Sequence, residues 1–356
     1  MWIGINSVEF EAEDMHFVKK VGLEAATQMV LRHRENNRTP FLYDTHQLSV
    51  LLSVPHSELL RVIGDIPSFY RLSQIKKRSG GFREISEPMF PLNVMQKMVL
   101  LRILYQIKPS PYACAYFPGA SLTRNAYPHV GKRFLLKMDI TDFFGSIRSD
   151  MVCRTVFDES RFPKEIGETL TALCCLHGAL PQGTSTSPAL SNLVMRDFDA
   201  AFGSWCLERK LRYTRYCDDI TVSGNTSLYP AYQKAKELLS DSGFVLNEKK
   251  TRFITNASRQ TVTGLCVNEK LSVPSDYKRA LRQELYYVNK FGIADVIKRQ
   301  RLKAYEGPGG CAEYYHHLMG RLNYILSVEW GNRYFLNAKS ALCRQREAIF
   351  SSADEG

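Results

Sequence analysis

Two β-rich segments flank a pair of adjacent aspartates in the middle of the chain. Residues 211–216 (LRYTRY) and 220–223 (ITVS) have strand character, and Asp218 and Asp219 follow Cys217 between them. This pattern predicts a tight β-hairpin with two carboxylates at its tip. Neighbouring carboxylates repel each other, so such a hairpin is destabilised unless a cation lies beside it. A solvated turn is the alternative interpretation of an isolated Asp-Asp pair.

A third aspartate follows another predicted strand. Residues 134–138 (FLLKM) run directly into Asp139, and Asp142 is expected on the turn that leaves this strand. Transfer of a nucleotidyl group needs positioning and charge neutralisation more than covalent help from the protein. Two divalent ions, held by aspartates at strand ends and hairpin turns, can supply both. We therefore expect Asp139, Asp218 and Asp219 to hold divalent ions. Asp142 could compete with Asp139 as a ligand, but its place on the turn favours Asp139.

The remaining chain alternates between helical and strand patterns. A basic loop at 75–83 contains Gly80 and Gly81, which predict a turn between two strands, and 262–267 has strand character. Helices are expected over residues 12–62, 92–107, 149–177, 188–207, 231–242 and from about 275 to the end. The pattern predicts an α+β fold with an all-helical C-terminal part.

Composition and charge limit the class of protein. The 356 residues are 44% hydrophobic and carry a net charge of +11, which allows a sizeable core and suits a polyanionic partner or simply a basic, solvated surface. The nine cysteines contain no C-x-x-C pair, which argues against a zinc ribbon and for reduced thiols. The acidic start is unlike a signal peptide, and no long apolar run follows. A cytoplasmic protein without a membrane segment is expected.

Four motifs make the prediction specific: 136–144 (LKMDITDFF), 180–188 (LPQGTSTSP), 216–219 (YCDD) and 243–251 (GFVLNEKKT). In this order they resemble the first metal-binding segment, the P-Q-G segment, the Y-x-D-D box and the following lysine segment of reverse transcriptases. A single match of four residues is weak, whereas the collinear set is a strong signal. The resemblance implies an RNA-directed DNA polymerase with a right-hand fold of fingers, palm and thumb.

Three further segments resemble those of bacterial retron reverse transcriptases. Residues 125–129 (NAYPH) and 262–264 (VTG) are similar to retron blocks, and 321–328 (RLNYILSV) looks like the end of a retron thumb. The similarity covers roughly residues 65–335, and Cys217 departs from the alanine that is usual in retrons.

The resemblance implies a domain organisation. It gives an N-terminal helical region at 1–64, interleaved fingers and palm at 65–274, and a basic helical thumb at 275–356 that binds RNA.

The resemblance also implies roles for single residues. Asp139, Asp218 and Asp219 would ligate two Mg²⁺ ions, for which Mn²⁺ could substitute. The finger loop that grips the nucleotide triphosphate corresponds to Lys76 or Lys77, with Arg83, whose guanidinium fork suits phosphate oxygens. Phe144, five positions after Asp139, matches the steric gate that excludes a 2′-OH.

Further roles fall on the later motifs. Gln182 and Gly183 match positions that contact the incoming nucleotide and the template, and Lys250 matches the proton donor to pyrophosphate. Taken one at a time, core packing, a solvated loop or a turn would explain each of these residues; their collinearity favours the functional interpretation.

Basic and aromatic residues are interleaved in the C-terminal region, which suits contacts to phosphates and unpaired bases as well as a solvated helix face. The resemblance favours RNA binding there and extends it to Asn125 and His129, for which satisfaction of a local loop is the alternative. The basic candidates are Lys278, Arg279, Arg282, Lys298, Arg299, Arg301 and Lys303.

The retron resemblance implies specific partners. The partners are dNTPs, host RNase H, and a cognate noncoding RNA with its cDNA product, which are joined as a branched RNA–DNA molecule (msDNA). A separate effector protein in anti-phage defence is also implied.

One alternative is a group II intron or CRISPR-associated reverse transcriptase, although the sequence leaves no room for a maturase segment after the thumb. Another is an RNA-binding scaffold without catalysis, which retention of all three aspartates disfavours. Phe144 disfavours an RNA-templated RNA polymerase.

Overall fold

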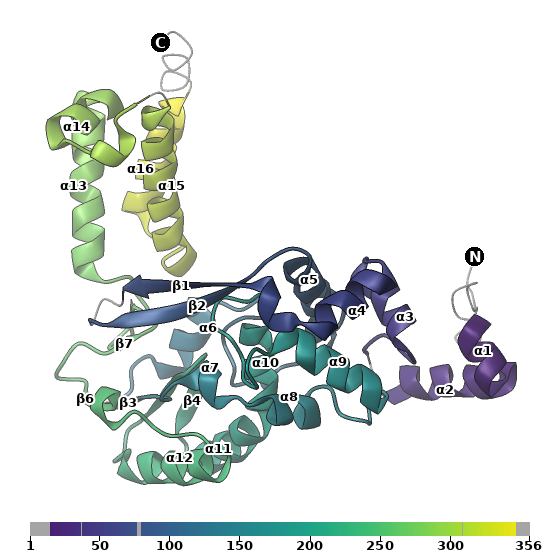
Figure 1. Cartoon of the computed structure of the whole chain (residues 1–356). Helices are drawn as coiled ribbons and strands as arrows, with labels where there is room; N and C mark the ends of the chain where they lie inside the picture. Colours follow the sequence, from purple (N-terminus) through teal and green to yellow (C-terminus); the bar gives the residue numbers. More distant parts are fainter. Residues whose placement is uncertain (1–14, 37, 77–79, 308, 347–356) are drawn as a thin grey trace, which may run out of the picture. The chain divides into compact units, whose positions relative to one another are not determined.

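The computed structural model describes residues 15–36, 38–76, 80–307 and 309–346 (Figure 1). It combines helices with antiparallel strand pairs, so the expected α+β class is confirmed. The described residues form two compact units. Unit 1 is drawn from Met1–Ser121, Leu136–Val222 and Ser227–Phe253, and unit 2 from Leu122–Leu135, Ser223–Thr226 and Ile254–Gly356.

Helices form most of the N-terminal region, as the sequence predicted. They are α1 (Met15–Val21), α2 (Leu23–Asn36), α3 (Thr45–Leu52) and α4 (His56–Gly64). Gly22 separates α1 from α2 with a φ of 87°, a left-handed conformation that suits glycine. Asp44 caps α3, because its side chain accepts a hydrogen bond of 2.8 Å from the Gln47 amide.

The predicted strand pair around the basic loop is confirmed. Strands β1 (Tyr70–Lys76) and β2 (Phe82–Pro88) pair antiparallel (Figure 1). In their register Ile75 lies opposite Arg83. Lys77 lies outside the described residues.

A four-stranded sheet carries the predicted carboxylates. Its strands β3 (Phe134–Asp139), β4 (Arg212–Tyr216), β5 (Asp219–Gly224) and β6 (Arg252–Thr255) lie in the order β4-β5-β3-β6. The strand before Asp139 and the hairpin around Asp218 are therefore confirmed. Leu135, Leu136 and Met138 of β3 and residues 220–224 of β5 are buried, so both strands lie in the interior of the protein.

The further helices of unit 1 are α5 (Leu92–Arg102), α7 (Phe143–Ser146), α8 (Ser149–Thr155), α9 (Lys164–Cys174), α10 (Ser187–Val194), α11 (Arg196–Glu208) and α12 (Tyr229–Asp241). The helix predicted over 231–242 is confirmed as α12, whereas two longer predictions are not. The continuous helix expected over 149–177 is wrong: Phe157 and Phe162 turn into the core, and Pro163 then starts α9. The helix expected over 188–207 is interrupted at Met195.

Unit 2 contains two short helical segments and a helical C-terminal part. The elements are α6 (Leu122–Ala126), η4 (Tyr127–His129), β7 (Thr261–Val262), β8 (Leu265–Cys266), α13 (Ser275–Phe291), α14 (Ile293–Gln300), α15 (Gly310–Val328) and α16 (Arg333–Arg344). The single strand predicted over 262–267 is wrong, because Thr263 and Gly264 have φ values of 45° and 83° and form a tight turn between β7 and β8.

The helices of unit 2 share one hydrophobic core. Leu281 and Leu285 of α13, Leu318 and Leu322 of α15, and Phe335 of α16 are buried in it. The spacing of four residues places each leucine pair on one helix face. Truncating Leu322 to alanine would cost about 2–5 kcal/mol of stability.

The predicted domain limits at 64/65 and 274/275 remain predictions, although α4 ends at Gly64 and α13 begins at Ser275. Among the described residues, no helix is long and apolar enough to span a membrane.

Candidate active site

A two-residue turn, Cys217 and Asp218, joins β4 to β5, and Asp219 is the first residue of β5. Cys217 has a φ of 60°, so the chain reverses direction sharply at this residue. The Asp218 carbonyl then accepts a 3.2 Å hydrogen bond from the amide of Ile140, the residue after Asp139. This bond brings the hairpin tip to the end of β3, so the three predicted aspartates come from adjacent backbone segments.

Backbone pairing also brings Lys250 to Asp139. The Asn247 amide donates to the Asp139 carbonyl at 2.7 Å, and the Thr141 amide donates to the Val245 carbonyl at 2.8 Å. Three residues after Asn247, the Lys250 ammonium donates to both Asp139 carboxylate oxygens at 3.0 and 2.9 Å. A cation therefore lies directly at the end of β3.

The hairpin carboxylates are in an environment that disfavours negative charge. Burial raises the pKa of Asp218 above its ordinary value, and the Asp139 carboxylate raises it further. Burial also raises the pKa of Asp219, with Asp218 adding repulsion. A cation beside these groups would relieve both effects.

A cleft of about 910 Å³ opens beside the carboxylates. It is lined by Asp139 and Asp218 together with the predicted nucleotide-binding residues Lys76, Arg83, Phe144 and Gln182. Phe144 is partly buried and packs against the buried Phe143, with ring centroids 5.6 Å apart. Cationic, apolar and acidic side chains therefore meet in one cavity, as a nucleoside triphosphate requires.

The P-Q-G segment is fixed to the β1–β2 hairpin. The Ser86 amide donates to the Gln182 carbonyl at 2.7 Å. Gly183 has a φ of 113°, and a Cβ there would lie 2.7 Å from Ile85 Cγ2. Only glycine allows this close approach, so Gly183 has a structural role whether or not it contacts template.

Asp142 lies on the turn after β3, as expected, and is the residue before α7. A Cβ at Gly145 would lie 2.3 Å from Asp142 Oδ2, so this carboxylate folds back over the start of the helix.

The sequence interpretation missed some cleft residues. Tyr116, Asn247 and Cys217 also line the cavity. Tyr116 has a φ of 61°, and its ring lies 6.2 Å from that of Tyr216. Asn247 stands within the lysine segment, which could have drawn attention to it; nothing local distinguishes Tyr116.

The carboxylate oxygens of the three predicted aspartates suit hard divalent cations. Within the ranges that the structure describes, no three His, Cys, Asp or Glu side chains converge as a ready-made metal cage. However, Mg²⁺ is usually held by one or two carboxylates together with substrate phosphates. Asp139, Asp218 and Asp219 offer oxygen ligands of this kind, so they fit metal ions that arrive with a nucleotide.

Comparison with protein families matches residues 75–276 to the reverse transcriptase (RNA-dependent DNA polymerase) model. The chain belongs to the reverse transcriptase family. The RNA-directed DNA polymerase activity and the right-hand polymerase fold expected from the motifs are thereby confirmed, and an RNA template is a partner.

Curated relatives support the retron resemblance. The Retron Ec86 reverse transcriptase of Escherichia coli is 28% identical over 295 residues, covering 82% of this chain and 86% of that protein. The Retron Mx65 reverse transcriptase of Myxococcus xanthus is 32% identical over 232 residues, covering 60% of this chain and 54% of that protein. Among solved structures, telomerase from Candida albicans with an RNA fragment matches with a TM-score of 0.46 and 12% identity, over 80% of this chain and 63% of that one.

In this reverse transcriptase the two retron-like blocks meet inside unit 2. Asn125 is buried and its Nδ2 donates to Thr263 Oγ1 at 3.4 Å. His129 is also buried, and its Nδ1 lies 2.7 Å from Ser223 Oγ. The first block therefore supports the β7–β8 turn from within, and direct RNA contact by Asn125 or His129 remains a prediction.

The basic residues of unit 2 that were predicted to bind RNA differ in whether their side chains are accessible. Lys278 pairs with Glu329 at 2.7 Å and is mostly buried, so it is committed to the fold. Arg282 lies over the rings of Tyr334 and Phe335. The candidates with exposed side chains are Arg279, Arg282, Lys298, Arg299, Arg301 and Lys303.

Proposed function

We propose that this reverse transcriptase transfers nucleotides with two Mg²⁺ ions held by Asp139, Asp218 and Asp219. The observation that carries the proposal is that Asp139 and Asp218 line one cleft with Arg83 and Phe144, with Asp219 next to them at the start of β5. When bound, the ions supply neutralisation of the charge that develops on the transferred phosphoryl group.

The chain's own residues complete the reaction. Lys76 and Arg83, exposed at the cleft edge, bind the triphosphate. Phe144 lies against the sugar and excludes a 2′-OH. Lys250 donates a proton to pyrophosphate once the nucleotide is bound, because an ammonium in the same cleft reaches the leaving group.

Replacement of Asp218 by asparagine tests this assignment. Primer extension on an RNA template should fall by about 10²–10³-fold or more, whereas RNA affinity should be retained. Asp142→Asn is the matched control, because this carboxylate lines the same cleft but folds over α7. Near-normal extension by the Asp218 variant would remove the metal assignment and favour a scaffold without catalysis.

We further propose that the template is a structured noncoding RNA and that synthesis begins from a 2′-OH within it, giving a branched RNA–DNA molecule. Support comes from the retron-like blocks at 125–129 and 262–264, which contact each other through Asn125 and Thr263. Such priming requires an RNA fold that holds one 2′-oxygen in line with the nucleotide phosphorus, a positioning effect worth several kcal/mol.

The product distinguishes this proposal from ordinary reverse transcription. The gene is expressed with its native flanking DNA, and small nucleic acids are extracted and treated with RNase and then with a 2′-5′ debranching enzyme. A DNA whose mobility shifts on debranching supports the proposal. Linear cDNA extended from a 3′-end would contradict it and leave the polymerase assignment intact.

By analogy with retrons, host RNase H, which would trim the template, and a separate effector protein are proposed partners in anti-phage defence. A plating assay with the gene and its neighbouring DNA, compared with the Asp218→Asn form, tests this. Equal phage sensitivity of the two would contradict it.

A further inference from the structure

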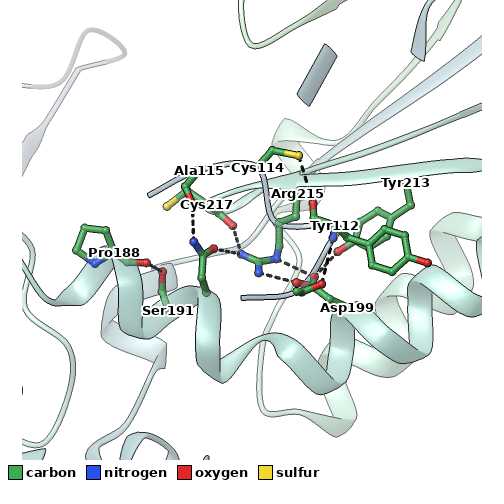
Figure 2. A network of polar contacts seen from close by, with 11 residues as sticks. Tyr112, Cys114, Ala115, Pro188, Ser191, Asp199, Tyr213, Arg215 and Cys217 are labelled. Carbon is green, nitrogen blue, oxygen red and sulfur yellow. Dashed lines mark hydrogen bonds and ion pairs between the residues drawn. The ribbon is translucent and has the colours of Figure 1, made fainter. Parts of the chain in front are cut away.

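Arg215 of β4 and Asp199 of α11 form an ion pair whose side chains are both 0% exposed. The contact is bidentate, with Nε 2.8 Å from Oδ1 and Nη2 2.7 Å from Oδ2 (Figure 2). Removing two charges from water is costly, and apolar residues of similar size often stabilise a core at least as well. Stability alone therefore does not explain why this pair is present.

The third nitrogen of the guanidinium points toward the active site. Arg215 Nη1 donates to the Cys217 carbonyl at 3.0 Å (Figure 2). This carbonyl belongs to the peptide group that joins Cys217 to Asp218. The peptide group that follows Asp218 is held by the Ile140 amide at 3.2 Å. Asp218 is thus fixed on its two sides, by a buried cation and by the end of β3.

The same guanidinium nitrogen reaches a second wall of the cleft. Arg215 Nη1 lies 3.1 Å from Asn192 Oδ1, and Asn192 Nδ2 donates to the Ala115 carbonyl at 2.6 Å. Ala115 precedes Tyr116, which lines the cleft. The network therefore connects the metal-binding turn with the segment that carries Tyr116.

Close packing around the ion pair restricts movement of the Arg215 and Asp199 side chains. The Tyr213 hydroxyl donates to Asp199 Oδ1 at 2.6 Å, and the Tyr112 ring stacks on the Tyr213 ring at 5.2 Å. A Cβ at Gly203 of α11 would lie 2.1 Å from the Tyr112 ring, so glycine is required there. A site supported in this way holds its ligands more accurately than an isolated turn can.

We propose that Arg215 is a positioning residue for metal binding, acting through the Cys217 carbonyl to orient Asp218, with Asp199 holding the guanidinium in place. The inference rests on the proposed role of Asp218 as a metal ligand. Arg215 itself does not line the cleft and contacts the reacting groups only through the turn.

The test uses a variant that removes both charges together. Arg215→Met with Asp199→Asn keeps an acceptor for Tyr213 and leaves no unpaired buried charge, but the Cys217 carbonyl loses its donor. Arg215→Lys is a second variant that preserves charge pairing, although an ammonium lacks the planar fork needed to bond both Asp199 and Cys217. If the double variant does not fold, Arg215→Lys carries the test.

Three quantities are measured on the full chain: Mn²⁺ affinity by electron paramagnetic resonance, kcat of primer extension, and RNA affinity. The proposal expects Mn²⁺ affinity to weaken and kcat to fall by about 10²-fold, as a misplaced ligand would cause, with RNA affinity unchanged. Tyr213→Phe is the matched control, since it removes a bond to Asp199 but retains that between Arg215 and Cys217. It should lower the unfolding temperature without altering Mn²⁺ affinity.

A folded Arg215 variant with wild-type Mn²⁺ affinity and kcat would overturn the positioning role. Asp218→Asn, assayed beside it, distinguishes a wrong metal site from a wrong role for Arg215. If Asp218→Asn also behaves like wild type, the proposed metal site is wrong; if Asp218→Asn alone is impaired, only the role of Arg215 is wrong.

Discussion

The Lys250 ammonium lies 2.9 Å from Oδ2 and 3.0 Å from Oδ1 of Asp139. The hydrogen bond to Asp139 raises the pKa of Lys250 above its ordinary value, so the side chain stays charged at neutral pH. Its side chain is 62% exposed, whereas that of Asp139 is 11% exposed. The lysine therefore neutralises a mostly buried carboxylate while remaining accessible to a nucleotide.

Replacing Lys250 with glutamine should lower kcat by about 10²–10⁴-fold if it is the proton donor to pyrophosphate. The dNTP KM should change much less, because Lys76 and Arg83 are the residues proposed to hold the triphosphate. Lys249→Gln is the matched control, since it removes the same charge from the neighbouring exposed position. Single-turnover extension measures the effect, and equal rates for the two variants would assign the proton transfer to another group.

Replacing Phe144 with valine should relax sugar selectivity. Removal of a steric clash worth about 1–3 kcal/mol corresponds to roughly 5- to 150-fold better use of ribonucleotides. Phe143→Leu, which alters the buried neighbour of Phe144, should lower stability without this change. The ratio of kcat/KM for dNTP and rNTP is the measurement. An unchanged ratio in Phe144→Val would make Phe144 a packing residue only.

Reversing the charge of Arg299 and Arg301 should weaken binding of the native RNA. Both side chains are exposed in unit 2, and Arg299 lies over the Phe291 ring at 4.5 Å. The slope of log affinity against log salt should become shallower by about 0.7–0.9 for each phosphate that the protein no longer neutralises. Lys97→Glu with Lys164→Glu, exposed lysines of unit 1, makes the same change in net charge. An equal weakening in both double variants would indicate a general charge effect.

His129 should make the fold sensitive to acid. Burial lowers the pKa of His129 to about 3, with the Lys132 charge contributing, from an ordinary value of 6.5. Between these values the unfolded chain binds a proton that the native state does not. The free energy of unfolding should therefore fall as pH decreases from about 6.5 toward 3, by up to about 1.4 kcal/mol per pH unit.

Urea unfolding of the wild type and of His129→Gln at a series of pH values measures this contribution. The variant lacks the titrating ring, so its curve should be flatter in that window. Parallel curves would show that His129 is not the group responsible.

Local sequence was sufficient to predict the reactive elements. The strand before Asp139, the hairpin around Asp218 and the glycine turn of the β1–β2 pair depend on alternation and turn residues that lie within a few positions of each other. Short-range geometry decides such features. The motif order then identified the polymerase family, because each motif carries its own chemistry.

Secondary structure was predicted wrongly where the local sequence pattern and side-chain burial favour different conformations. Residues 149–177 are rich in helix formers, but burial of Phe157 and Phe162 breaks the helix between α8 and α9. At 262–267 the β-branched residues predicted one strand, whereas Gly264 allows a reversal that buries Val262 against Leu265. In both cases burial of side chains outweighed intrinsic propensity.

By itself, then, the sequence determined which residue types could hold metal ions and nucleotide, and where along the chain they lie. Only the tertiary structure decided that Lys250 pairs with Asp139, that Asn125 supports Thr263, and that Arg215 is buried with Asp199 beside the turn at 217–218. These pairs join residues 16 to 138 positions apart in the sequence, and the strength of the Arg215–Asp199 pair depends on its removal from water. Periodicity and composition describe neither distance nor burial, which is why the polar network behind Asp218 could be found only in the folded chain.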